Sequence, residues 1–85
     1  MKRRETLPET SALIRWQFAR GEQHLTCAVL TEPTTSSYEV ATVPLWDVDH
    51  AALETFESPT AAMHRHAAIA AGLRDAGWTL ASYSA

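Results

Sequence analysis

The chain has 85 residues, of which 46% are hydrophobic, with a formal net charge of −3 and a single cysteine. This length allows one small domain, and the hydrophobic share is too high for a disordered chain. One cysteine excludes an intramolecular disulfide and a thiolate cage for zinc. From residue 11 onward four arginines stand against eight carboxylates, so we expect the folded part to repel the phosphate backbone of nucleic acids.

The N-terminal segment is polar. Residues 1–11 lack hydrophobic periodicity, so we expect a flexible tail followed by a single domain over residues 12–85. The basic residues Lys2, Arg3 and Arg4 are typical of the start of a signal peptide, but no hydrophobic region follows them. No stretch approaches the roughly 18 consecutive apolar residues of a membrane-spanning helix. We therefore expect a cytoplasmic protein without membrane contact.

Residues 13–30 carry the pattern of a β-hairpin. In LIRWQFAR and HLTCAVL, apolar and polar residues alternate with a period of two, as in strands that bury one face. The intervening RGEQ suits a type II′ turn, which has glycine at its first central position. This turn sets a register with three apolar cross-strand pairs on one side: Ile14–Val29, Trp16–Cys27 and Phe18–Leu25. Turn chemistry and alternation thus predict the same hairpin.

Residues 31–56 are less regular. TEPTTSS has the composition of a loop, and YEVATVPL is rich in β-forming residues. Val40 and Val43 would lie on opposite sides of a regular strand, and a β-bulge would bring them to one side. Pro44 indicates an edge strand or a strand end. WDVDH is turn-like, and AALETF fits either a short helix, by propensity, or a fourth strand.

Residues 58–76 predict one helix. Ser58 is a suitable N-cap, and Pro59 is a suitable first helical residue because its missing N–H needs no partner there. The residues expected on the buried face recur at spacings of three and four: Met63, His66, Ile69, Ala70, Leu73 and Ala76.

The end of this helix is predicted by LRDAGW. Gly77 fits the C′ position of a Schellman ending, in which Leu73 and Trp78 make the hydrophobic contact that closes the last turn. Trp78 is therefore interpreted as a structural residue rather than as a platform for a ligand. The residues after it can continue as an extended segment.

The order of these elements, together with ETFESPTAAMHRH and IAAGLRDAGW, resembles a loose group of small bacterial proteins of unknown function. In that group a β-meander whose last strand ends in Phe is followed by one helix that ends in Gly-Trp. The resemblance spans roughly residues 12–80, and its distinctive positions are Phe56, Leu73, Gly77 and Trp78. It implies that residues 51–56 are a strand that leads into the helix, and it supplies no catalytic residue.

The fold that we expect is therefore α+β. It has an antiparallel three- to four-stranded β-meander with one C-terminal helix packed across one face, in the order β-β-β-β-α, and a short extended segment can follow the helix.

The histidines do not predict a metal site. His64 and His66 are two residues apart on the predicted helix and point about 200° apart, so they cannot share an ion. His66 lies on the apolar stripe, where we expect a hydrogen-bonded, partly buried histidine. Asp47, Asp49 and His50 offer donors, but they lack the glycine and terminal glutamate of a calcium loop and a spaced histidine or cysteine partner. We expect no metal and no cofactor.

Patterns of nucleophilic and phosphate chemistry are also missing. The sequence has no G-x-S-x-G, and Gly21, Gly72 and Gly77 are scattered rather than gathered in a phosphate loop. Cys27 faces Trp16 in the predicted core, where a thiol acts as apolar filler. We expect neither an enzyme nor a small-molecule ligand.

The sheet face that the helix leaves uncovered is the candidate interaction surface. The hairpin places a mixed, semi-apolar set of residues there: Leu13, Arg15, Gln17, His24, Thr26, Ala28 and Leu30. This composition fits a modest interface and an ordinary exposed sheet equally well.

Two functions follow from this surface. The first is a non-catalytic protein-interaction or self-association module, with a protein partner or a second copy of the chain bound there. The alternative is binding of single-stranded nucleic acid on the same face, favoured by Arg15, Gln17, His24 and the basic N-terminal residues. The acidic body and the shortage of outward aromatic side chains oppose it.

Overall fold

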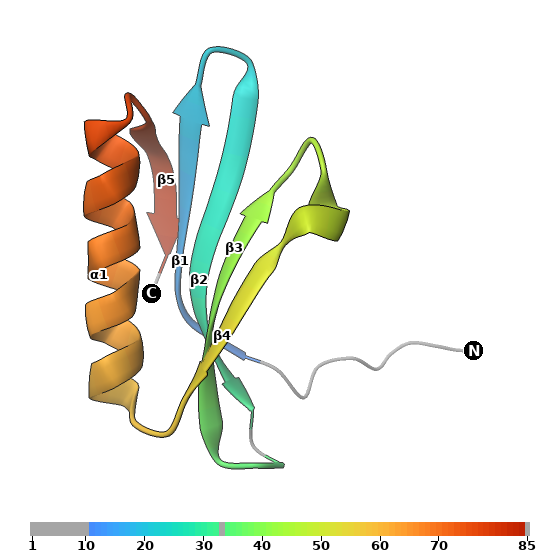
Figure 1. Cartoon of the computed structure of the whole chain (residues 1–85), viewed down its shortest axis with the longest axis vertical. Helices are drawn as coiled ribbons and strands as arrows, with labels where there is room; N and C mark the ends of the chain where they lie inside the picture. The colour runs from blue at the N-terminus through green and yellow to red at the C-terminus, as the bar shows by residue number, and fades with distance from the viewer. Residues whose placement is uncertain (1–10, 33, 85) are drawn as a thin grey trace.

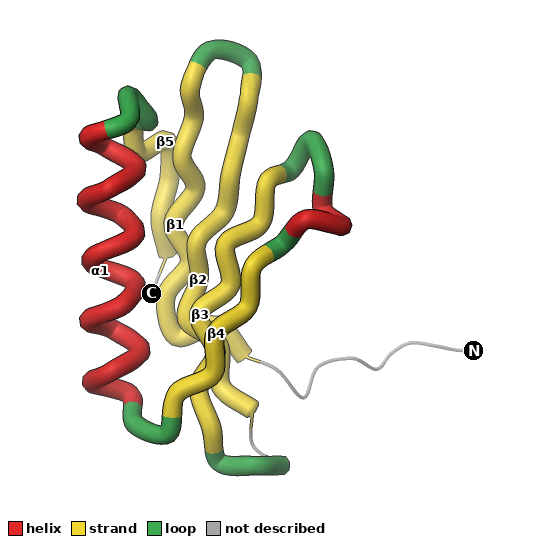
Figure 2. Tube along the Cα trace, in the orientation of Figure 1, coloured by secondary structure: helices red, strands yellow, loops and turns green. Residues whose placement is uncertain are grey.

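The computed structural model describes residues 11–32 and 34–84. In chain order its elements are β1 (Ser11–Arg20), β2 (Gln23–Glu32), β3 (Ser37–Pro44), the 3-10 helix η2 (Val48–His50), β4 (Ala52–Phe56), α1 (Pro59–Asp75) and β5 (Thr79–Ser84). All neighbouring strands are antiparallel and form one sheet in the order β4-β3-β2-β1-β5. Helix α1 runs along one side of this sheet (Figure 1), and the fold has two layers (Figure 2).

The β1–β2 hairpin confirms the predicted register. Trp16 pairs with Cys27, Phe18 with Leu25 and Ile14 with Val29. At the first central position of the turn, Gly21 has a φ of 62°, and at the second position Glu22 has a negative φ. Positive φ at the first position alone is the pattern of a type II′ turn. A regular hairpin with this turn keeps all six apolar residues on the side that faces α1.

Both ends of α1 form as predicted. The Ala61 N–H donates to the Ser58 hydroxyl at 3.0 Å, and Pro59 is the first helical residue. At the other end the Trp78 N–H donates to the Leu73 carbonyl at 2.9 Å. Gly77 has a φ of 96°, and its N–H donates to the Arg74 carbonyl at 3.0 Å. These two bonds define a Schellman ending.

The core lies between α1 and the sheet. Its largest fully buried side chains are Phe18, Val29, Val40 and Cys27. From the helix, Ala62, His66 and Ala70 are buried at a spacing of four, and Met63, Ile69 and Leu73 pack beside them. The predicted buried face was correct at its centre, but Ala76 is exposed and the buried Ala62 was missed.

Two sequence-based expectations for the sheet need correction. The sheet has five strands rather than three or four: the extended segment after α1 is a full strand, β5, and it pairs with β1 at the sheet edge. The bulge expected in β3 is wrong, because the β2–β3 register is continuous from Glu32–Ser37 to Leu25–Pro44. Val40 is buried under α1, and Val43 simply faces the other side of the sheet.

Other expectations for this region hold. Residues 52–56 form a strand, as the resemblance implied, and Pro44 ends β3. The predicted N-terminal tail lies outside the described residues except for Ser11, which begins β1 one residue before the expected domain boundary.

Candidate interaction surface

The sheet face opposite α1, called the open face below, is built from alternate residues of all five strands. Three rows run across it from the β5 side to the β4 side: Ser84-Arg15-Ala28-Ala41-Leu53, Ser82-Gln17-Thr26-Val43 and Ala12-Leu30-Glu39-Thr55. Because side chains alternate along a strand, each row lies on the side away from the buried pairs of the hairpin.

Six of the seven predicted surface residues lie on the open face. Arg15, Gln17, Thr26, Ala28 and Leu30 belong to the three rows, and His24 lies nearer the β1–β2 turn, where it pairs with Ala19. Leu13 is skipped by the register as the extra residue of a β-bulge in β1, and it is 37% exposed.

The open face is wider than the hairpin alone predicted. Strands β3 and β4 add Glu39, Ala41, Val43 and Leu53. The opposite parity of Val40 and Val43 was the signal for this, since it marks a strand with apolar residues on both faces. Leu53 is 61% exposed at the outer end of its row.

The middle of the open face consists of short apolar side chains. Ala28 and Ala41 pair with each other across β2 and β3 and are only 4% and 5% exposed. Neither described helix covers them, so we attribute their burial to the longer side chains that surround a methyl group in mid-sheet. The apolar area open to a partner here is therefore that of the longer neighbours Leu30, Val43 and Leu53.

The margin of the open face beside β5 is polar. Arg15 is exposed on β1 and lines a depression of about 220 Å³ with Gln17, Ser82, Tyr83 and Ser84. The Ser82 hydroxyl donates to the Gln17 side-chain oxygen at 3.5 Å. This part of the surface carries hydrogen-bonding groups and one positive charge.

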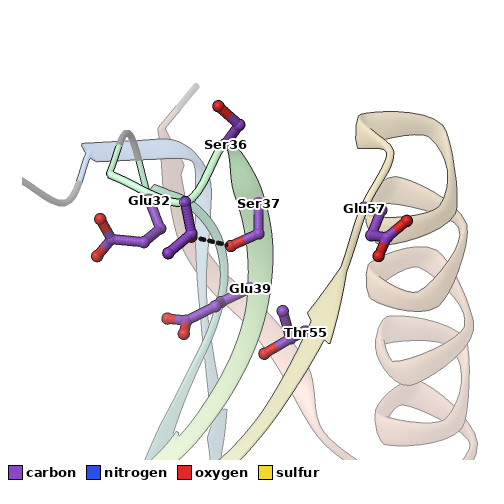
Figure 3. A pocket seen from close by; sticks show the side chains of 7 residues that line it. Glu32, Ser36, Ser37, Glu39, Thr55 and Glu57 are labelled. Carbon is purple, nitrogen blue, oxygen red and sulfur yellow. Dashed lines mark hydrogen bonds between the residues drawn. The ribbon is translucent and has the colours of Figure 1, made fainter.

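The opposite margin is acidic. A larger open depression of about 690 Å³ is lined by four hydroxyl residues and three glutamates: Thr35, Ser36, Ser37, Thr55, Glu32, Glu39 and Glu57. Figure 3 shows Glu39 and Thr55 side by side, as their pairing in the sheet requires, while Glu57 lies apart on the α1 side. The carboxylates do not converge. Within residues 11–32 and 34–84, no group of three histidine, cysteine, aspartate or glutamate side chains is placed to hold a metal ion.

Beneath the sheet, His66 occupies the site expected from its place on the apolar stripe. It is 3% exposed, its Nε2 lies 3.2 Å from the Cys27 carbonyl oxygen, and its ring meets that of Trp16 edge-on at 5.0 Å. Burial lowers the pKa of His66, and the hydrogen bond to Cys27 opposes this in part. His66 is thus a neutral donor within the core, while His64 is exposed.

Cys27 is a buried thiol on the same side of the sheet. It has 0% exposure, and its Sγ lies 3.9 Å from the Thr42 hydroxyl. Burial raises the pKa of Cys27, with the Thr42 contact acting in the opposite direction. A thiol that is kept protonated and out of contact with solvent serves as packing material.

The end of the core near the β1–β2 turn is closed by aromatic stacking. Trp78 is 6% exposed, with the Trp46 ring stacked on it at 5.9 Å and 10°. The Arg20 guanidinium lies 4.6 Å from the centre of the Trp78 ring and donates to the Ala76 carbonyl at 3.0 Å. The structural interpretation of Trp78 is confirmed. The contribution of Trp46 was missed, because a tryptophan in a turn gives no sign of which distant residue it covers.

No family model matches this chain, and neither a curated protein nor a solved structure shows significant similarity to it. The resemblance to small bacterial β-meander proteins therefore stays a prediction. Among the described residues, no helix is long and apolar enough to cross a membrane.

Proposed function

We propose that this chain is a non-catalytic protein-interaction or self-association module of the cytoplasm, and that its open face is the contact surface. The observation that carries this proposal is an apolar group on the open face, formed by Leu30, Val43 and Leu53 around the Ala28–Ala41 pair and flanked by one positive and one negative side chain, Arg15 and Glu39. Interfaces bury an apolar, water-excluded centre within a polar rim, and depletion of charge at the centre is their compositional signature.

A second copy of the chain is the partner that we test first. A twofold contact brings the same patch of both copies together, so it must be self-complementary. The open face satisfies this condition because Arg15 lies on β1 and Glu39 on β3, on either side of the apolar residues of β2. Arginine is well suited as an anchor, since it combines a planar stacking surface with five hydrogen-bond donors.

Nucleic-acid binding on the same face remains the alternative proposal, carried by Arg15, Gln17 and His24. The aromatic residues of β1, β3 and β4 weaken it: Trp16, Phe18, Tyr38 and Phe56 all pack toward α1. Within the described strands the open face thus lacks the aromatic platform on which unpaired bases stack.

The test compares Arg15→Glu with Arg74→Glu, the same charge reversal at an exposed position of α1. Mass is measured by light scattering over a concentration series at low and physiological salt. The proposal predicts that Arg15→Glu weakens the association at least tenfold, while Arg74→Glu and salt have little effect.

Two results would count against it. Equal association of both variants would remove the open face from the contact. Binding of an oligo-dT strand that fades steeply as salt rises, lost in Arg15→Glu, would favour the nucleic-acid alternative instead.

A further inference from the structure

The two edges of the sheet differ in how well they are protected. Edge strands present unpaired backbone groups that can add a further strand, and proteins commonly protect them with charge, proline or a β-bulge. Strand β4 is only five residues long and carries Glu54, whose carboxylate accepts hydrogen bonds from the Arg65 Nε and Nη2 at 2.8 and 3.1 Å. Strand β5 has the sequence TLASYS, with neither a charged residue nor a proline, and all six residues are exposed.

The protection that β5 does have is a β-bulge, and this bulge also gives the edge an apolar side. Gln17 pairs with Ser82 but Phe18 pairs with Leu80, so Ala81 is the extra residue. Without it, Leu80 and Tyr83 would point to opposite faces of the sheet. With it, both lie on the α1 side, where Leu80 is 40% and Tyr83 is 70% exposed. Tyr83 is held there by edge-on contact with the Trp16 ring at 6.4 Å.

We infer that β5 pairs antiparallel with β5 of a second copy, which joins two five-stranded sheets into one. A twofold axis between Ala81 and Ser82 sets Leu80 of each copy opposite Tyr83 of the other, and Thr79 opposite Ser84. The faces agree at both pairs: Leu80 and Tyr83 lie on the α1 side, while Thr79 and Ser84 lie on the open face beside Ala19 and Arg15. The strand is therefore self-complementary in face and in apolar contact, with the bulge residue Ala81 opposite Ser82 at the axis.

Charge does not oppose this pairing. Arg15 neighbours Ser84, so in the paired sheet the two Arg15 side chains lie roughly 20 Å apart, given about 4.8 Å between strands and about 3.3 Å per residue. That distance exceeds the Debye length of about 8 Å at physiological salt. The glutamates that line the larger depression lie on β2, on β3 and just after β4, away from the β5 edge.

This inference goes beyond the proposed function, because it names a second contact between copies, at the edge of the sheet rather than on the open face. Its test places a charge on each edge strand in turn. Tyr83→Lys and Tyr83→Glu alter β5, and Ala52→Lys, at an exposed position of β4 on the α1 side and off the open face, is the control on the other edge. Sedimentation equilibrium measures the dissociation constant of the dimer, and thermal unfolding checks that each variant remains folded.

We expect a wild-type dimer whose dissociation constant rises at least tenfold in both Tyr83 variants and changes less than twofold in Ala52→Lys. In a sample that mixes carbon-13-labelled and unlabelled chains, isotope-filtered spectra should show Leu80 methyl protons of one copy close to the Tyr83 ring of the other.

A wild-type chain that stays monomeric at the highest concentrations used for NMR would overturn the inference. So would a dimer that tolerates both Tyr83 variants. If such a dimer is instead broken by Arg15→Glu, the β5 contact is wrong while association through the open face stands.

Discussion

Replacing Trp78 by alanine tests how the helix end and the core are joined. Trp78 is 6% exposed and is covered by Trp46 and Arg20. Truncation of a buried tryptophan costs about 3–5 kcal/mol, whereas a chain of this size has a total stability of roughly 4–13 kcal/mol. The variant should therefore lose about a quarter or more of the free energy of unfolding.

Urea unfolding followed by circular dichroism measures this loss. With a slope of about 1 kcal/mol per M for a small domain, the midpoint should fall by roughly 3 M. Trp46→Ala is the control, because Trp46 is 52% exposed and forms only the outer layer of the stack; its loss should be less than half as large. An unchanged midpoint for Trp78→Ala, or a larger loss for Trp46→Ala, would refute the structural role of Trp78.

Further predictions concern the glycines and the buried histidine. Gly77→Val should lower the free energy of unfolding by more than about 1 kcal/mol, because a β-branched residue resists a φ of 96°. Gly72→Ala should raise it by about 0.5–1 kcal/mol, since an added methyl group meets open space on the helix; equal effects in urea unfolding would contradict the Schellman ending. The pKa of His66 is lowered by burial from its usual 6.5, so the unfolded chain takes up a proton before the folded one does. Stability should be complete above about pH 6.5 and fall as the pH drops from there toward the folded-state pKa. His66→Gln should flatten this decline in a pH series of urea midpoints, while His64→Gln should leave it as in the wild type.

Features that depend on neighbouring residues could be predicted from the sequence. The hairpin register follows from Gly21 and the alternation around it, and the helix ends follow from Ser58, Pro59 and Gly77. These elements are specified by turn chemistry, capping and side-chain period, which all act over a few residues.

Features that depend on distant pairing could not be predicted. The sequence of β5 reads as extended, but its place beside β1 depends on where the chain returns after α1. Val43 was misinterpreted for a related reason: a strand in mid-sheet can carry apolar residues on both faces, and alternation alone does not reveal the second face. The candidate site was accordingly predicted for β1 and β2, while its β3 and β4 part was missed.

The most direct test of the account is a map of backbone amide shifts in the nitrogen-15-labelled chain over a concentration series, repeated with an oligo-dT strand. Association through the sheet predicts concentration-dependent shifts at Arg15, Ala28 and Ala41 and along β5, with none on the exposed side of α1 and none caused by the oligonucleotide. Shifts that stay fixed over the open face and β5 at every concentration, or that respond to the oligonucleotide alone, would contradict it.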